Sequence, residues 1–182
     1  MNSFPLVRRI VTGHDERGNA IIDSDSALTS FRPQDLLGPS NQISDEAEDR
    51  AKDARFVVLW RTDAFPAPLQ GPWTDYNNKP LPLNDPTGTI ARIVDMPPGL
   101  SSPFHRTVSL DVGVVLVGEV VLELDNAVEA TVRQGETIIQ RGTIHAWHNR
   151  GERMARVLFV LVPGQKIEIG GNIIPPTKLG VN

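Results

Sequence analysis

Residues 99–118 read GLSSPFHRTVSLDVGVVLVG, and residues 135–149 read GETIIQRGTIHAWHN. These two segments hold three of the four histidines of the chain, and the residues between them are mostly β-branched or apolar. Side chains alternate along a strand, so His105 and Thr107 point to the same face of the first segment. Two histidine-bearing strands with a carboxylate close by are what a metal site inside a small β-barrel requires.

The first segment resembles the first motif of the cupin superfamily. Gly99, His105 and Gly118 stand at the spacing of that motif. Thr107 occupies the position of its second histidine, and Asp111 occupies the position of its glutamate. The resemblance therefore carries two substitutions among the positions that hold metal in the family.

The second segment resembles the second cupin motif. Gly142, His145 and Asn149 match its positions. Gln140 replaces the proline of the motif, and four residues rather than five separate it from Gly135. Together the two motifs cover about 75 residues, which is specific for the fold but weaker for activity, because one fold hosts many functions.

The resemblance implies an all-β fold, a double-stranded β-helix or jelly-roll barrel with extra N-terminal strands and long loops. We divide the chain into N-terminal strands and a polar loop packing on the barrel (1–54), the barrel itself (55–164) and a C-terminal tail (165–182). Fifteen glycines and fifteen prolines suit many short strands joined by turns. Period-two patterns predict strands at residues 7–14, 20–23, 55–61, 89–95, 112–118, 119–125, 129–135, 136–140 and 154–162.

Composition narrows the class of protein. The chain has 182 residues, enough for one domain with a real core, and a net charge of −4 with no basic block. We therefore expect no nucleic-acid partner. It has no cysteine, hence no disulfide. With no signal peptide and no apolar run of about 18 residues, we expect a cytoplasmic protein with no membrane partner.

Two histidines and one carboxylate can bind one face of an octahedral metal and leave other positions open. His105, Asp111 and His145 are the predicted ligands of one divalent Fe, Mn, Ni, Zn or Cu ion. We predict Asp111, Thr107 and His145 as catalytic residues, with the Thr107 hydroxyl bonding to metal-bound water or to substrate. If Asp111 does not reach the metal, it is a general base or orients His105. His148 follows His145 by three residues and should face the opposite side.

Within the superfamily the chain resembles small single-domain cupins of bacteria and of fungal secondary-metabolite pathways, described as oxidoreductases or decarboxylase-like tailoring enzymes. This implies a metal-dependent enzyme acting on a small oxygenated organic acid or polyketide, and it favours a homodimer. Two alternatives stay open: a metal-free acid–base isomerase or dehydratase that uses the same three side chains, and a non-catalytic barrel that binds a small molecule.

Other side chains are candidates for the walls of a binding site. The residues that can supply apolar walls are Phe104, Ile144, Trp147 and Phe159, and the arginines that can pair a substrate carboxylate are Arg106, Arg141 and Arg156. The long connection between residues 64 and 86 contains Trp73 and Tyr76, which we expect either to plug one end of the barrel or to line the substrate entrance. The isoleucines of the tail should dock on a sheet edge or on a neighbouring subunit.

Overall fold

The computed structural model of the chain describes residues 4–33, 53–77 and 79–177. Within these ranges regular structure is almost entirely β, apart from short 3-10 structure such as η2 (Asp125–Ala127). None of the described helical structure is long and apolar enough to cross a membrane. Most of the predicted polar loop lies outside the described residues.

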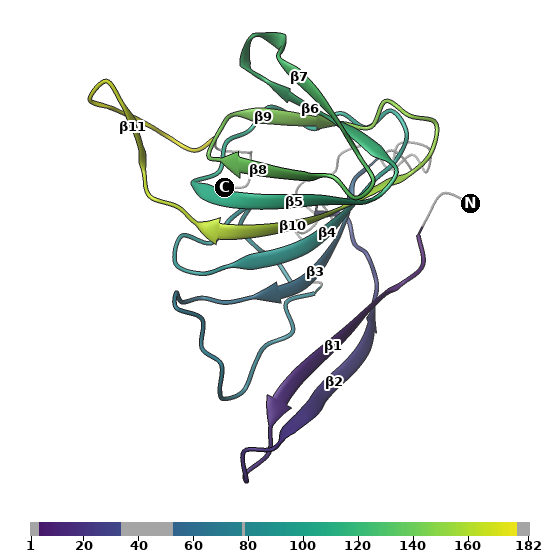
Figure 1. Ribbon diagram of the computed structural model, residues 1–182, viewed down its shortest axis with the longest axis vertical. Helices are drawn as coiled ribbons and strands as arrows, with labels where there is room; N and C mark the ends of the chain where they lie inside the picture. Colours follow the sequence, from purple (N-terminus) through teal and green to yellow (C-terminus); the bar gives the residue numbers. More distant parts are fainter. Residues whose placement is uncertain (1–3, 34–52, 78, 178–182) are drawn as a thin grey trace.

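Two antiparallel sheets form the body of the molecule (Figure 1). The larger has the strand order β3-β4-β10-β5-β8, and the smaller has the order β7-β6-β9. Strands β4 and β10 are neighbours in the sheet although they lie far apart in the sequence, so the sheet is built largely from long-range pairings. The bounds in chain order are β3 Arg55–Arg61, β4 Ile90–Met96, β5 Ser109–Val117, β6 Glu119–Leu124, β7 Glu129–Arg133, β8 Thr137–Arg141, β9 His145–His148 and β10 Ala155–Pro163.

The main core lies between these two sheets. In β10 and in the first seven residues of β5, every second side chain is buried, as the period of a strand requires when one face of a sheet meets the core. The buried cluster draws on six strands and comprises Val94, Met96, Val115, Val120, Leu122, Val132, Trp147, Ala155, Val157, Phe159 and Leu161. The predicted jelly-roll architecture is confirmed.

Gly118 forms the tight turn between β5 and β6 that the sequence predicts. Its φ is +81°, a left-handed conformation that L side chains rarely adopt. A Cβ atom here would lie 3.2 Å from the Cα of Ala155, so both the conformation and the space favour glycine. The turn lets the chain pass directly from the larger sheet to the smaller one.

The N-terminal strands β1 (Val7–His14) and β2 (Ala20–Leu28) form a separate hairpin that extends away from the barrel beside β3 (Figure 1). Its base packs on the outer face of the larger sheet, where Leu28 joins Val57 and Ile93 in a second apolar cluster. The extra N-terminal strands thus contact the barrel through their base.

Trp73 packs between the N-terminal hairpin and β3, so the expectation that it plugs one end of the barrel is wrong, and a place at the substrate entrance stays a prediction. Its ring lies 5.3 Å from that of Trp60 on β3 and beneath the guanidinium of Arg9 on β1. Its Nε1 atom donates a hydrogen bond to Asp23 Oδ2 on β2 at 2.5 Å. The long loop therefore joins the hairpin to β3. Tyr76 lies under the Arg61 guanidinium.

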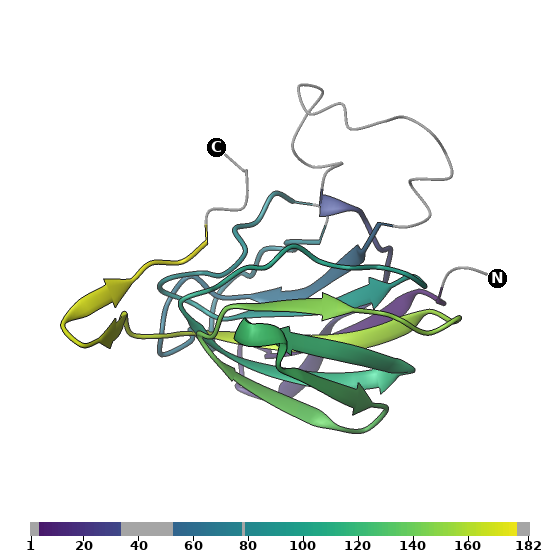
Figure 2. The same cartoon turned by 90° about the horizontal axis from the view of Figure 1, so that it is seen from above.

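The tail forms its own hairpin, β11 (Ile167–Ile169) and β12 (Asn172–Ile174), which projects from the barrel (Figures 1 and 2). Its strands pair with each other and with no other described strand, so the prediction of docking on a sheet edge of the barrel is wrong, whereas docking on a neighbouring subunit stays a prediction. Beyond the hairpin, the Thr177 N–H donates to the Arg106 carbonyl oxygen at 3.0 Å. The tail therefore contacts the loop that carries His105.

Candidate functional site

His105 and His145 meet because the loop before β5 pairs with β9. The two residues exchange both backbone hydrogen bonds, with N···O distances of 2.9 and 3.0 Å, in an isolated antiparallel bridge. Residues directly opposite each other in such a bridge present their side chains to the same face. Their ring centroids lie 4.2 Å apart, and His145 is only 3% exposed.

The hydrogen bonds of the two imidazoles fix their tautomers. The Nδ1 atom of His105 lies 2.9 Å from the Pro103 carbonyl oxygen, and Nδ1 of His145 lies 3.0 Å from the Thr143 carbonyl oxygen. A carbonyl oxygen only accepts, so we infer that each Nδ1 carries the proton and each Nε2 retains its lone pair. Burial lowers the pKa of His145 to about 4 and also lowers that of His105. Both rings are therefore neutral at pH 7.

Asp111 and Thr107 form a small hydrogen-bonded group with Ser109. The Ser109 hydroxyl lies 2.5 Å from Asp111 Oδ1 and 2.9 Å from Thr107 Oγ1, and Thr107 Oγ1 lies 3.3 Å from Asp111 Oδ2. All three side chains are buried. Burial raises the pKa of the Asp111 carboxyl, while the Ser109 hydroxyl, the Arg92 guanidinium and the Thr107 hydroxyl oppose the rise. Ser109 was not predicted, although it shares the face of Thr107 and Asp111 by strand alternation.

Of the three predicted metal ligands, the two imidazoles, His105 and His145, are suited to binding a metal. Two neutral rings, each held by a backbone carbonyl at Nδ1 and free at Nε2, have the arrangement found in metal-binding histidines. Asp111 is held instead by Ser109 and Thr107. Among the described residues, no three His, Asp or Glu side chains gather closely enough to form a metal-binding group. The roles predicted for His105, Asp111 and His145 therefore stay predictions.

His148 faces away from this site, as the period of the strand predicts. Its Nε2 atom lies 2.7 Å from Glu123 Oε2 and its Nδ1 atom lies 2.9 Å from the Ser101 hydroxyl oxygen. Trp147, which lies between His145 and His148 in the sequence of β9, points inward and belongs to the main core. It packs edge-on against Phe159, with ring centroids 5.4 Å apart, so the site has an apolar aromatic floor.

The arginine that reaches the interior is Arg92, which the sequence reasoning missed. Arg156 forms an ion pair with Asp95, and Arg106 donates to the Gly142 carbonyl oxygen. Arg92 alternates on β4 with the core residues Val94 and Met96, and its charge influences both His105 and Asp111. Burial lowers its pKa to about 10, so it remains a cation at pH 7. The sequence signal that could have revealed Arg92 is a basic residue at a position of the strand where the alternation of side chains predicts an apolar one.

Gln140 is the second interior residue whose side chain has an unused donor. It lies opposite Asp111 in the pairing of β5 with β8 and is 4% exposed. Its Nε2 atom and the Nε atom of Arg92 are buried without a hydrogen-bond partner in the described part of the chain. Buried donors without acceptors are rare in folded proteins, and each one requires an explanation.

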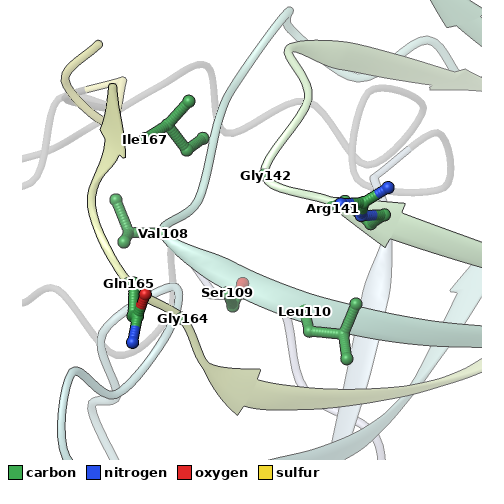
Figure 3. A pocket seen from close by; sticks show the side chains of 8 residues that line it. All are labelled: Val108, Ser109, Leu110, Arg141, Gly142, Gly164, Gln165 and Ile167. Atoms are coloured by element: carbon green, nitrogen blue, oxygen red, sulfur yellow. The ribbon is translucent and has the colours of Figure 1, made fainter. Parts of the chain in front are cut away.

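A groove of about 240 Å³ lies at the end of the barrel where β5 begins and β8 and β10 end (Figure 3). Neither imidazole lines it, so this groove is separate from the histidine pair. Ser109 connects the two, because it lines the groove and its hydroxyl contacts Asp111. The lining residues are Val108, Ser109, Leu110, Arg141, Gly142, Gly164, Gln165 and Ile167.

Comparisons with known proteins identify the family of this chain. The family model of the cupin domain matches residues 92–161. The chain is 32% identical over 170 residues to the cupin-domain-containing oxidoreductase fogC of Aspergillus ruber, covering 91% of this chain and 76% of that protein. It is 30% identical over 172 residues to the phomopsin biosynthesis cluster protein C' of Diaporthe leptostromiformis, covering 91% of this chain and 83% of that protein.

Among solved structures, a cupin 2 conserved barrel domain protein from Salinispora arenicola is 18% identical, with a TM-score of 0.43. The match covers 67% of this chain and 90% of that chain. The sequence relatives extend over nearly the whole chain, beyond the two motifs from which the resemblance started. On the strength of these relatives and of the matched domain, the chain belongs to the cupin-domain family.

Proposed function

We propose that this protein is a metal-dependent cupin oxidoreductase acting on a small oxygenated organic molecule, with its reaction centre between His105 and His145. The observation that carries the proposal is the pair of neutral imidazoles with free Nε2 atoms at the barrel interior. The names of relatives that cover most of this chain support the reaction class. Their association with biosynthesis clusters supports a secondary-metabolite substrate.

The Nε2 atoms of His105 and His145 would hold the metal. A metal bound there would supply Lewis-acid chemistry, or would activate dioxygen if it is redox-active. The side chains of the barrel would accept a proton, position the proton acceptor and exclude water. The buried Asp111 carboxylate, with its raised pKa, accepts a proton from substrate, and the Thr107 and Ser109 hydroxyls hold that carboxylate in position. Trp147 and Phe159 exclude water beneath the reacting atoms.

The experiment is metal analysis of protein purified without added metal. His105→Ala and His145→Ala should each remove the bound metal, because each deletes one of only two imidazoles at the centre. The matched control is His148→Ala, which deletes the outward-facing histidine of the same strand and should leave the metal content unchanged. A full equivalent of metal in either interior variant would reject the ligand assignment.

The interior also supports a second candidate function, metal-free acid–base catalysis. Asp111 is held by two hydroxyls and is not grouped with the histidines as a third ligand in the described structure. A neutral imidazole pair with a carboxylate nearby can transfer protons without a metal. One measurement distinguishes the two functions. Metal-free catalysis requires turnover of substrate to survive complete chelation of metal, whereas a metal-dependent oxidoreductase requires turnover to stop.

We further propose a homodimer formed through the outer face of β5 and β8. Three large apolar side chains on this face are exposed: Leu110 by 41%, Leu116 by 36% and Ile139 by 55%. Apolar side chains grouped on one exposed sheet face are typical of an interface between subunits. Size-exclusion chromatography with light scattering should give twice the monomer mass, and Ile139→Lys should shift it to the monomer; a monomeric wild-type protein would reject this assembly.

A further inference from the structure

Arg92 and Gln140 bring two unused hydrogen-bond donors to the end of the barrel that holds the histidine pair. Gln140 lies directly opposite Asp111 in the strand pairing, and the charge of Arg92 influences Asp111. The Nε atom of Arg92 and the Nε2 atom of Gln140 have no acceptor in the described residues. Both residues therefore belong to the part of the interior that holds Asp111, whose carboxylate is already bonded to the Ser109 and Thr107 hydroxyls.

Asp111 does not satisfy the Arg92 guanidinium. Its oxygens contact the Ser109 and Thr107 hydroxyls, one on each side of the carboxylate. The guanidinium instead lies over the ring of Phe56, 5.2 Å from its centroid, which supports the cation but offers no acceptor. The Arg92 side chain is partly buried, and a cation held there without an anionic partner is unfavourable in the protein alone, which marks Arg92 as a candidate for binding an anionic ligand.

We propose that Arg92, assisted by Gln140, binds the carboxylate of the substrate, so that the substrate class is a small organic acid with an apolar body. A planar guanidinium matches a carboxylate through parallel hydrogen bonds, and the Gln140 amide offers a third donor. The apolar body would lie on the floor formed by Trp147 and Phe159. The inference rests on the proposed function, because it takes the interior beside His105 as the substrate site.

Gly113 gives independent support for a ring-lined floor at this depth. It lies opposite Phe159 in the pairing of β5 with β10, and a Cβ atom there would lie 3.0 Å from the Phe159 ring. The absence of a side chain at Gly113 thus leaves room for the aromatic ring directly next to Asp111 on the same face of β5. An acid with an aromatic or alkyl body would meet apolar surface below and donors around it.

The test is equilibrium binding of benzoate and of its neutral analogue benzamide, measured by isothermal titration calorimetry on the full chain. Wild-type protein should bind benzoate at least about ten-fold more tightly than benzamide, because only benzoate neutralises Arg92. Arg92→Gln should abolish this preference, and Arg92→Lys should retain part of it, since lysine keeps the charge but not the fork. The matched control is Arg133→Gln, which removes an exposed arginine at the end of β7 that pairs with Glu119 at 3.0 Å, and it should preserve the preference.

Each outcome decides the matter. Because Arg92→Gln removes a partly buried cation that has no anionic partner among the described residues, its melting temperature should equal or exceed that of the wild type, so lost selectivity cannot be ascribed to unfolding. Titrations repeated after chelation separate this inference from the metal proposal. Preference for benzoate that survives chelation and disappears in Arg92→Gln supports the arginine site, whatever the metal content. Equal binding of the two probes, a preference retained in Arg92→Gln, or one abolished by chelation would overturn it.

Discussion

Asn149→Asp should be strongly destabilising although it replaces only an amide by a carboxyl. Asn149 is 1% exposed, and its Nδ2 atom donates to the carbonyl oxygens of Met96 and Arg153, both at 2.8 Å. Its Oδ1 atom accepts from the Gly151 N–H at 3.0 Å. An ionised aspartate keeps only the last of these bonds. The substitution therefore leaves two carbonyl oxygens without their donors and places a charge beside them.

The magnitude follows from these lost bonds. Each buried acceptor left unsatisfied costs about 1–3 kcal/mol, so the free energy of unfolding at pH 7 should fall by about 4 kcal/mol. Burial and the two facing carbonyls raise the pKa of the new carboxyl in the folded state above its unfolded value of about 3.9. The folded state then holds more protons than the unfolded state between the two pKa values. Stability consequently declines as pH rises through that interval, and the deficit is smaller at acid pH.

Urea unfolding followed by circular dichroism at several pH values measures this effect, with the midpoint shifting and the slope constant. Asn126→Asp is the matched control, because Asn126 is exposed and should change stability by less than about 0.5 kcal/mol. Asn149 also links backbone segments, since Gly99 N–H donates to its carbonyl oxygen at the start of the loop that carries His105. An Asn149→Asp protein within about 1 kcal/mol of wild type at pH 7 would refute this reasoning.

Two further predictions concern the loop between β3 and β4. Gly88→Ala should lower the free energy of unfolding, measured in urea, by about 3 kcal/mol, because the new Cβ would lie 1.8 Å from the Thr62 carbonyl oxygen. The control is Gly135→Ala, which has free space for a Cβ but a φ of +86° and should cost about 1 kcal/mol. Equal costs for the two variants would show that the overlap with Thr62 is not what destabilises Gly88→Ala. The Arg9 side chain lowers the pKa of Asp75 by hydrogen bonding, so this pair stabilises the fold above the unfolded pKa of about 3.9 and loses that contribution as pH falls. Asp75→Asn should therefore cost roughly 1 kcal/mol at pH 7 and progressively less below about pH 4, whereas a deficit independent of pH would show that the ion pair contributes nothing.

The barrel strands were predictable because their side chains alternate between a buried and an open face. The pattern at residues 154–162 matches β10 (Ala155–Pro163), and the pattern at residues 89–95 matches β4 (Ile90–Met96), each shifted by one residue. The same period predicts that His148 faces away from His145. Periodicity is a local property, so one sequence is enough to reveal it.

The contacts that hold the long loop and the tail could not be predicted in this way. Trp73 is placed by Trp60, Arg9 and Asp23, which come from three different segments. Nothing in the local sequence around Trp73 specifies these partners, because they depend on how the N-terminal hairpin packs beside β3. Ser109 was missed for a related reason: a strand was expected from residue 112, whereas β5 begins three residues earlier.

The charges at the interior connect the metal proposal with the substrate proposal. The two imidazoles are neutral at pH 7, and the Asp111 carboxyl is bonded to two hydroxyls. Arg92 is then a cation whose charge no neighbour among the described residues balances by direct contact. A divalent metal on the imidazoles would add to this positive charge, so an anionic substrate would stabilise both together, and by linkage each would increase the affinity of the other. A barrel that bound only neutral molecules would gain nothing from a cation at a core-facing position of β4, so on our proposal Arg92 would restrict the substrate more narrowly than either cupin motif does.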